Sequence, residues 1–235
     1  MTENKYSKIL VLGAGPVVIG SSSEYDYSAV SVCRALKEEG ISVVSVNSNP
    51  DTIMTDKNVA DTVYIEPLNG ETVKKIIEKE IPDAIIGTTG GEAGLEICLE
   101  LLQNGYLDEH GTKLLGIKPE TIKAIRNEQA LRDTLENVGE PYVSAKVLPT
   151  DAECVTFAGE IGFPVLISPA FTPDFSEPIR CENANDILSG FGSCAERSLV
   201  NEVYVRKCVD DYKEVEFVAM RDSFGNCISV SSTEN

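Results

Sequence analysis

The run LGAGPVVIG, residues 12–20, has glycines spaced so that backbone amides can face an anion. It follows an apolar stretch typical of a strand and precedes a stretch typical of a helix. Gly13, Gly15 and Gly20 therefore lie where a phosphate can meet a helix amino terminus. A tight turn that packs the helix against the strand requires the same glycines, and the sequence favours that interpretation.

A dinucleotide site fits this turn poorly. The spacing is GxGxxxxG, with Val18 in place of the third glycine of the fingerprint. The next predicted strand ends in VNSNP, so Asn47 and Asn49 stand where a carboxylate would bind a ribose. These mismatches argue against NAD or FAD, and they leave the two asparagines as candidate contacts for another ligand.

A second strand-to-helix turn is GTTGGEAGLE, residues 87–96. Thr88, Thr89, Gly90 and Gly91 can receive an anion through hydroxyls and amides, or they can cap the helix that follows. In an open parallel sheet the carboxyl ends of the strands line one crevice, which is the usual ligand site. We therefore expect the two turns to share a crevice.

Residues for acid–base or nucleophilic catalysis are scarce. The single histidine, His110, is expected in a solvated loop, and no Ser/His/Asp or Cys/His arrangement is visible. Seven scattered cysteines without a CxxC spacing indicate reduced, mostly buried thiols, and they argue against a zinc site or a disulfide framework. We predict no catalytic residue and no metal site.

Glu214 and Glu216 alternate along a predicted strand and face the same way. They can bind a cation or a ribose, or they can form a solvated strand face. The candidate binding residues are Gly13, Gly15, Asn47, Asn49, Thr89, Gly90, Gly91, Glu214 and Glu216.

Short apolar strands alternate with amphipathic helices through the first half, which predicts a Rossmann-like, doubly wound parallel sheet. After residues 118–128 the pattern changes to an α+β arrangement, and the last segment indicates two strands around a DSFGN turn. We predict one domain at residues 1–122 and a second at residues 123–235.

The formal net charge of −18 disfavours binding to nucleic acid or to an anionic membrane. No apolar run approaches the roughly 20 residues that a membrane span needs, and the start of the sequence lacks the plan of a signal peptide. We expect a cytoplasmic protein.

The chain resembles the amino-terminal end of the carbamoyl-phosphate synthetase large subunit. The matching strings run along the whole chain in the family's order and include KILVLGAGPVVIG, VNSNPDTIMTD, PDAIIGTTGGEAGLE, GFPVLISPAF and RDSFGNCISVSSTEN. The resemblance implies a pre-ATP-grasp domain followed by part of an ATP-grasp domain. It also implies ATP and Mg²⁺ as cofactors, for the phosphorylation of bicarbonate and carbamate.

The departures from the family lie where nucleotide chemistry is expected. The family arginine of the IIRPSF string, which reaches phosphate, is Ser168 here. A second family arginine aligns with Ala130, and the neighbouring Arg132 replaces it only if the register of the alignment slips. A family glutamate near the nucleotide ribose aligns with Lys207, whereas Glu214 and Glu216 match acidic positions of the family.

The glycine-rich lid of the family is replaced by TPDFSEPIR, residues 172–180. Pro173 has no N–H, and Asp174 and Glu177 add negative charge beside a polyphosphate. In the resemblance, the carboxylates and the asparagine that bind the metal align beyond residue 235, so ATP and Mg²⁺ are doubtful cofactors.

Three hypotheses follow. The favoured one is a truncated, diverged homologue, a pseudoenzyme without complete synthetase activity by itself, which binds a small anion or a protein partner or forms a homo-oligomer. The alternative is part of a split ATP-dependent synthetase or ligase that another chain completes. The third is an unrelated nucleotide-binding enzyme that uses the crevice of the first half.

Overall fold

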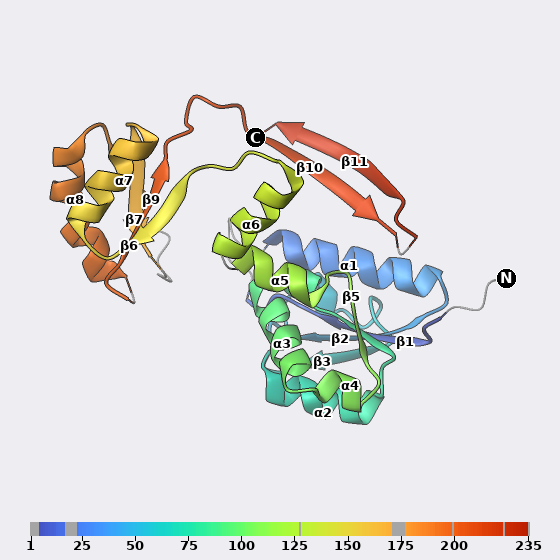
Figure 1. Ribbon diagram of the computed structural model, residues 1–235. Helices are drawn as coiled ribbons and strands as arrows, with labels where there is room; N and C mark the ends of the chain where they lie inside the picture. Colours follow the sequence, from blue (N-terminus) through green and yellow to red (C-terminus); the bar gives the residue numbers. More distant parts are fainter. Residues whose placement is uncertain are drawn as a thin grey trace. The chain divides into compact units, whose positions relative to one another are not determined.

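The computed structural model describes residues 5–16, 23–126, 128–170, 177–198, 200–222 and 224–234 (Figure 1). The chain divides into two compact units, residues 1–138 and 139–235. The boundary expected from the sequence, between residues 122 and 123, falls inside helix α5 (Pro119–Arg126), and it stays a prediction about domains.

A five-stranded parallel sheet with the order β3-β2-β1-β4-β5 forms the centre of the first unit. Its central strands are buried almost throughout, which explains their mostly apolar composition, although Ser45 and Asn47 of β2 are buried polar residues. The chain runs outward from β1 to β3 and returns on the other side at β4, so the switch point lies between β1 and β4. The strands are β1 (Lys8–Leu12), β2 (Ser42–Asn47), β3 (Thr62–Ile65), β4 (Ala84–Ile86) and β5 (Lys113–Leu115).

Helices cover both faces of this sheet (Figure 1). Ile9 and Val11 of β1 pack in one core cluster with α1, whereas Leu10 and Leu12 pack in the other with α2 and α3. The arrangement confirms the predicted doubly wound α/β fold. The remaining elements of this unit are α1 (Ser23–Glu38), η1 (Ile53–Thr55), α2 (Gly70–Glu80), η2 (Thr88–Gly90), α3 (Gly91–Gln103), α4 (Tyr106–Glu109) and α6 (Glu128–Val138).

The second unit contains a four-stranded antiparallel sheet with the order β6-β9-β7-β8. Residues of α7 and α8 form one core cluster with alternate residues of the strands. Asn183 and Asp186 make a capping box at the start of α8, and Thr150 caps α7. The elements are β6 (Ala145–Leu148), α7 (Asp151–Ile161), β7 (Val165–Pro169), β8 (Ile179–Cys181), α8 (Ala184–Arg197) and β9 (Val203–Lys207).

The last two strands, β10 (Val215–Arg221) and β11 (Cys227–Glu234), form the antiparallel hairpin that the sequence predicts. A register shift between Val218 and Ala219 marks a bulge. Asp222 organises the turn, because its Oδ1 accepts hydrogen bonds from the backbone N–H groups of Phe224 and Asn226. Across the described parts of both units, no helix has the length and apolar character that a membrane crossing requires.

Candidate functional site

The turns after β1, β2 and β4 meet at the carboxyl edge of the first sheet. The amide of Gly13 donates to the carbonyl of Val46 at 2.8 Å, and the hydroxyl of Thr89 donates to the carbonyl of Leu12 at 2.8 Å. A Cβ on Gly90 would lie 2.8 Å from the carbonyl oxygen of Gly13. The structure therefore brings candidate residues from three turns together, and their role in binding stays a prediction.

Packing at this edge explains the glycines. A Cβ on Gly13 would lie 2.5 Å from Nδ2 of Asn47 and 2.8 Å from Sδ of Met54. Gly15 and Gly91 have φ values of +80° and +56°, which side chains of L-residues rarely adopt. These positions need glycine whether or not a ligand is present.

The amide donors expected to receive an anion are largely engaged within the protein. Besides the Gly13 bond, the amide of Gly90 donates to the carbonyl of Gly87 at 3.0 Å, and the amide of Gly91 donates to the carbonyl of Thr88. Since an N–H satisfied by the backbone gains little from a ligand, these bonds favour the tight-turn interpretation. Gly20 lies outside the described residues.

Asn47, the last residue of β2, and Asn49 shape the loop that follows the strand. Asn47 is buried, and its Oδ1 accepts a hydrogen bond from the amide of Asn49 at 3.1 Å. Oδ1 of Asn49 in turn accepts from the amide of Asp51 at 2.9 Å. Side-chain oxygens that bond to a backbone amide two residues ahead form Asx turns, which replace regular structure at loop starts. The structure thus gives both asparagines a conformational role.

Asp26 of α1 was not singled out in the sequence, although it belongs to this edge. Its carboxylate accepts hydrogen bonds from the amides of Ile53 at 3.1 Å and Met54 at 3.3 Å. Those amides begin the short η1 helix, where N–H groups lack partners within the helix. A carboxylate on one helix and a loop 27 residues later give no local signal that links them.

In the second unit, the positions of interest for nucleotide chemistry lie on β7 and β9. Ser168 of β7 is half-buried and pairs with Tyr204 of β9. Lys207, at the end of β9, directs its ammonium to backbone carbonyls, with Nζ 2.9 Å from the oxygen of Gly162 and 3.4 Å from that of Phe163. Lys207 therefore links the end of β9 to the segment that precedes β7.

The two candidate glutamates lie at the start of the hairpin. Glu216 pairs with Thr233 of β11, and Glu214 directly precedes β10. Both side chains are exposed. Among the described residues, no group of three or more histidine, cysteine, aspartate or glutamate side chains is placed to hold a metal ion. Of the altered lid, Glu177 is exposed, whereas Pro173 and Asp174 lie outside the described residues.

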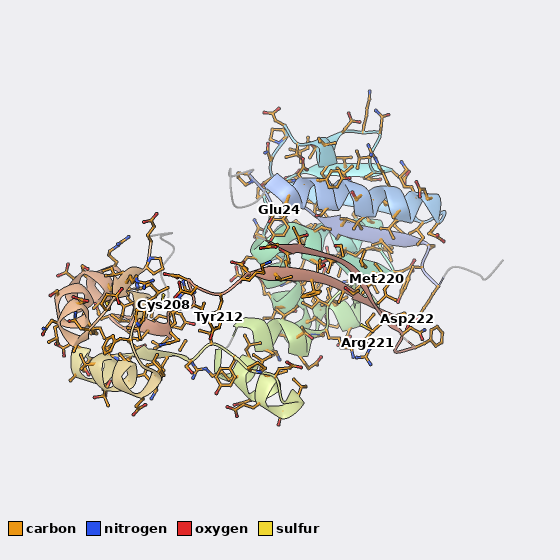
Figure 2. The ribbon with its side chains drawn as sticks, turned by 90° about the horizontal axis from the view of Figure 1, so that it is seen from above. Glu24, Cys208, Tyr212, Met220, Arg221 and Asp222 are labelled. Carbon is orange, nitrogen blue, oxygen red and sulfur yellow. The ribbon has the colours of Figure 1, made fainter. Side chains whose placement is uncertain are left out.

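A charged cluster joins β8 to the segment after β9, which also carries Cys208 and Tyr212 (Figure 2). Arg180 donates through Nε to Glu182 at 2.8 Å and through Nη1 to Asp210 and to the sulfur of Cys208. Hydrogen bonds from Cys208 and Arg180 hold the pKa of Asp210 below its ordinary value. Two carboxylates thus neutralise Arg180, so the cluster does not offer a cation to a ligand.

Five cysteines are buried, which confirms the prediction for most of the thiols. Burial raises the pKa of Cys98 to about 12 and that of Cys33 to about 11. It likewise raises the pKa of Cys154 to about 12 and that of Cys181 to about 11. A thiol that stays protonated at neutral pH is a poor nucleophile and a poor metal ligand.

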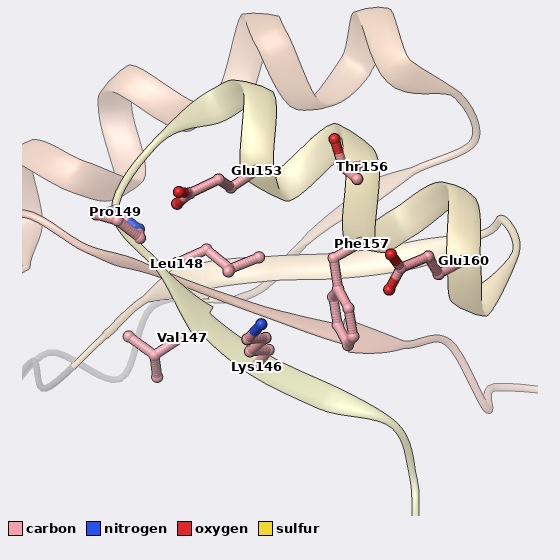
Figure 3. Close-up of a pocket in the computed structure, with 8 residues that line it drawn as sticks. All are labelled: Lys146, Val147, Leu148, Pro149, Glu153, Thr156, Phe157 and Glu160. Atoms are coloured by element: carbon pink, nitrogen blue, oxygen red, sulfur yellow. The ribbon is translucent and has the colours of Figure 1, made fainter.

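A groove of about 400 Å³ lies between β6 and α7 (Figure 3). Phe157 points from the helix toward the strand, and Glu153 and Glu160 lie on its two sides (Figure 3). No sequence pattern predicted this groove, because its residues are ordinary for a strand and an amphipathic helix. Its lining consists of Lys146, Val147, Leu148, Pro149, Glu153, Thr156, Phe157 and Glu160.

Solved biotin carboxylase structures share this fold. The biotin carboxylase domain of 2-oxoglutarate carboxylase from Hydrogenobacter thermophilus, solved with MgADP and bicarbonate, matches 97% of this chain and 50% of its own at a TM-score of 0.74 and 20% identity. Biotin carboxylase from Campylobacter jejuni matches 98% of this chain and 51% of its own, also at 0.74 and 20% identity. At such identity the likeness shows the fold alone.

Sequence relatives give the family. The large chain of carbamoyl phosphate synthase from Agathobacter rectalis is 46% identical over 232 residues, and that from Clostridium perfringens strain SM101 is 42% identical over 228 residues. These matches cover 99% and 97% of this chain but only 22% and 21% of the relatives. Residues 5–124 match the carbamoyl phosphate synthase preATP-grasp domain, and residues 127–235 match the ATP binding domain of the synthase L chain. On these matches the chain belongs to the carbamoyl phosphate synthase large-chain family.

Proposed function

We propose that this chain does not make carbamoyl phosphate by itself and acts as a binding or assembly module for a small anion or a protein partner. The observation that carries the proposal is the bonding of Lys207 to the carbonyls of Gly162 and Phe163. An ammonium group only donates hydrogen bonds, so Lys207 cannot accept from ribose hydroxyls as a glutamate does. The position thus has a structural role in this chain.

Ser168 supports the same conclusion. An arginine at this position would present a planar, permanently charged fork that binds phosphate oxygens in pairs. A serine has a short neutral side chain, so that contact is lost. Two replacements on neighbouring strands, one at each end of the expected nucleotide, weaken ATP binding together.

One observation favours the alternative, in which the chain is part of a split ATP-dependent ligase. Arg206 pairs with Leu166, two residues before Ser168, so Arg206 and Ser168 lie on the same face of the sheet. A diagonal neighbour in an antiparallel pair is about 7–8 Å away, within reach of an arginine side chain. Arg206 is therefore the residue that could replace the missing phosphate contact.

Thermal melting with Mg-ATP, Mg-ADP and bicarbonate separates the two proposals. A nucleotide at 100 times its dissociation constant would add about 2.7 kcal/mol, or several degrees of melting temperature. We expect no shift beyond that of magnesium chloride alone, and no bicarbonate-dependent ATP hydrolysis. A shift of several degrees that Arg206→Met removes and the control Arg221→Met keeps would refute the binding-module proposal in favour of the split ligase.

A further inference from the structure

β6 forms one of the two edges of the four-stranded sheet, and among the described residues it pairs with β9 on one side only. The amide of Lys207 donates to the carbonyl of Ser144, so these two residues form a hydrogen-bonded pair of the antiparallel ladder. Such pairs alternate with non-hydrogen-bonded pairs, whose N–H and C=O groups point away from the partner strand. Ala145 and Val147 occupy those positions, opposite Arg206 and Tyr204.

The outward backbone groups of this edge lack partners within the described part of the chain. No hydrogen bond to the backbone of Ala145 or Val147 occurs among those residues. Ala145 is only 3% exposed, whereas Val147 is half-buried, so Val147 offers the more accessible of these outward groups. A backbone donor or acceptor that is withdrawn from water without a partner costs about 1–3 kcal/mol. Pairing with an added strand would remove that cost, which is how sheet edges bind extended peptides.

The helix beside the edge presents side chains suited to one kind of strand. Residues 153, 156, 157 and 160 of α7 line the groove, and this spacing places them on one face of the helix (Figure 3). Phe157 provides an apolar surface at the centre, and Glu153 and Glu160 are exposed on either side of it. Lys146 supplies a single positive charge, so the lining keeps a net negative charge.

The distances along helix and strand agree. Seven residues of helix separate Glu153 from Glu160 by about 10 Å. Alternate residues of a strand face the same side about 7 Å apart, so two cations on either side of a central residue are about 13 Å apart. Flexible lysine or arginine side chains close the difference of about 3 Å.

We infer that β6 and α7 form a docking site for an extended peptide segment. The three residues of this segment that face α7 are, in order, basic, apolar and basic. The segment adds a strand to β6 through Ala145 and Val147. Its apolar residue packs against Phe157, and its two cations meet Glu153 and Glu160. This gives the partner-binding role of the proposed function, on which it rests, a specific chemistry.

Synthetic peptides test the site on the full chain. The probe is TKTVTKT, acetylated and amidated, in which both lysines share a face with valine. The matched control KTTVTTK has the same composition but places its lysines on the opposite face, and TETVTET reverses the charge. We expect TKTVTKT to bind at least tenfold more tightly than either control, with NMR shifts at residues 144–148 and along α7. Equal affinities, or shifts confined to other residues, would overturn the inference.

Two variants locate the contacts. Glu153→Gln with Glu160→Gln should weaken TKTVTKT binding about three- to thirtyfold at low salt. The control is Glu71→Gln with Glu78→Gln, also seven residues apart on one helix. It changes the net charge equally and should alter binding less than twofold.

Val147→Pro tests the backbone contact. It removes an outward N–H while keeping the ladder to β9, and should weaken binding at least tenfold. Equal losses in the two glutamine pairs would overturn the site.

A second copy of this chain is the competing occupant. If β6 edges paired between copies, the amides of Ala145 and Val147 would gain hydrogen-exchange protection as protein concentration rises, and sedimentation would show a dimer that Val147→Pro dissociates. That result would overturn the peptide assignment. The Mg-ATP melting experiment addresses a different surface, so failure of peptide binding and failure of the proposed function are separately visible.

Discussion

The charged side chain of Lys207 forms hydrogen bonds to backbone carbonyl groups. Its ammonium lies 2.9 Å from the carbonyl of Gly162 and bridges two positions 45 residues apart in sequence. Hydrogen bonds to a charged group contribute more than neutral ones, because the carbonyl dipole points at a full charge. The alignment with a family glutamate identified the position as altered, but only the contact shows what the new residue does.

We predict that Lys207→Met lowers the free energy of unfolding by about 1–3 kcal/mol. Methionine keeps most of the length of the side chain and removes the donor to the carbonyls of Gly162 and Phe163. Urea unfolding measures the loss. Lys213→Met is the control, because Lys213 makes an exposed ion pair with Glu234 and should change stability by less than about 0.5 kcal/mol. Equal values for the two variants would contradict the structural role of Lys207.

At the scale of elements, the sequence predicted most of the first unit. Apolar runs predicted the five strands, and helical spacing predicted the main helices. Because both glycine-rich turns follow parallel strands, the sequence also predicted that the turns after β1 and β4 lie at one edge of the sheet. Hydrogen bonds across that edge could not be predicted. The hydroxyl of Thr89 bonds to a carbonyl 77 residues away, and no local pattern distinguishes that use from anion binding. The groove beside β6 was missed for the same reason, because it depends on which strand lies at the edge.

Substitution of Gly13 tests whether packing requires a glycine at the first turn. We predict that Gly13→Ala destabilises the protein by about 1–3 kcal/mol, because the new methyl would overlap the buried side chain of Asn47. Gly159→Ala in α7 meets nothing within 4 Å and should be neutral or stabilising by up to about 1 kcal/mol. Thermal melting of the two variants gives opposite signs if packing decides. A neutral Gly13→Ala would instead show that Asn47 moves aside freely.

For the whole molecule, the large number of carboxylates means that stability should depend strongly on pH in the acidic range. The formal net charge of −18 makes negative groups repel one another at neutral pH, which destabilises the fold. Carboxylates that accept hydrogen bonds from specific partners stabilise the fold and offset part of this repulsion. Asp83 accepts hydrogen bonds from the hydroxyl of Ser7 and from the amides of Ser7 and Lys8, and these bonds lower its pKa. The pKa of Asp61 is lowered by the amide of Val43, and that of Glu80 by the hydroxyl of Tyr64. Asp83 and Asp61 thus bond to the beginnings of β1 and β2, and Glu80 joins α2 to β3.

Lowered pKa values fix the direction of the pH dependence. A carboxylate whose folded-state pKa lies below its unfolded-state value stabilises the fold fully above the unfolded value, near 4, and that contribution disappears as the pH falls through the folded value. We predict that the strands of the first unit lose stability below about pH 4, and that Asp83→Asn makes this loss shallower because one linked proton is removed. Hydrogen exchange at Leu10 between pH 3 and pH 7 follows the change in β1. Asp108→Asn, an exposed position of the same unit, should leave the slope as it is. Identical slopes for Asp83→Asn and the unmodified chain would mean that the bonds of Asp83 persist after protonation, and that the acid sensitivity of this sheet arises elsewhere.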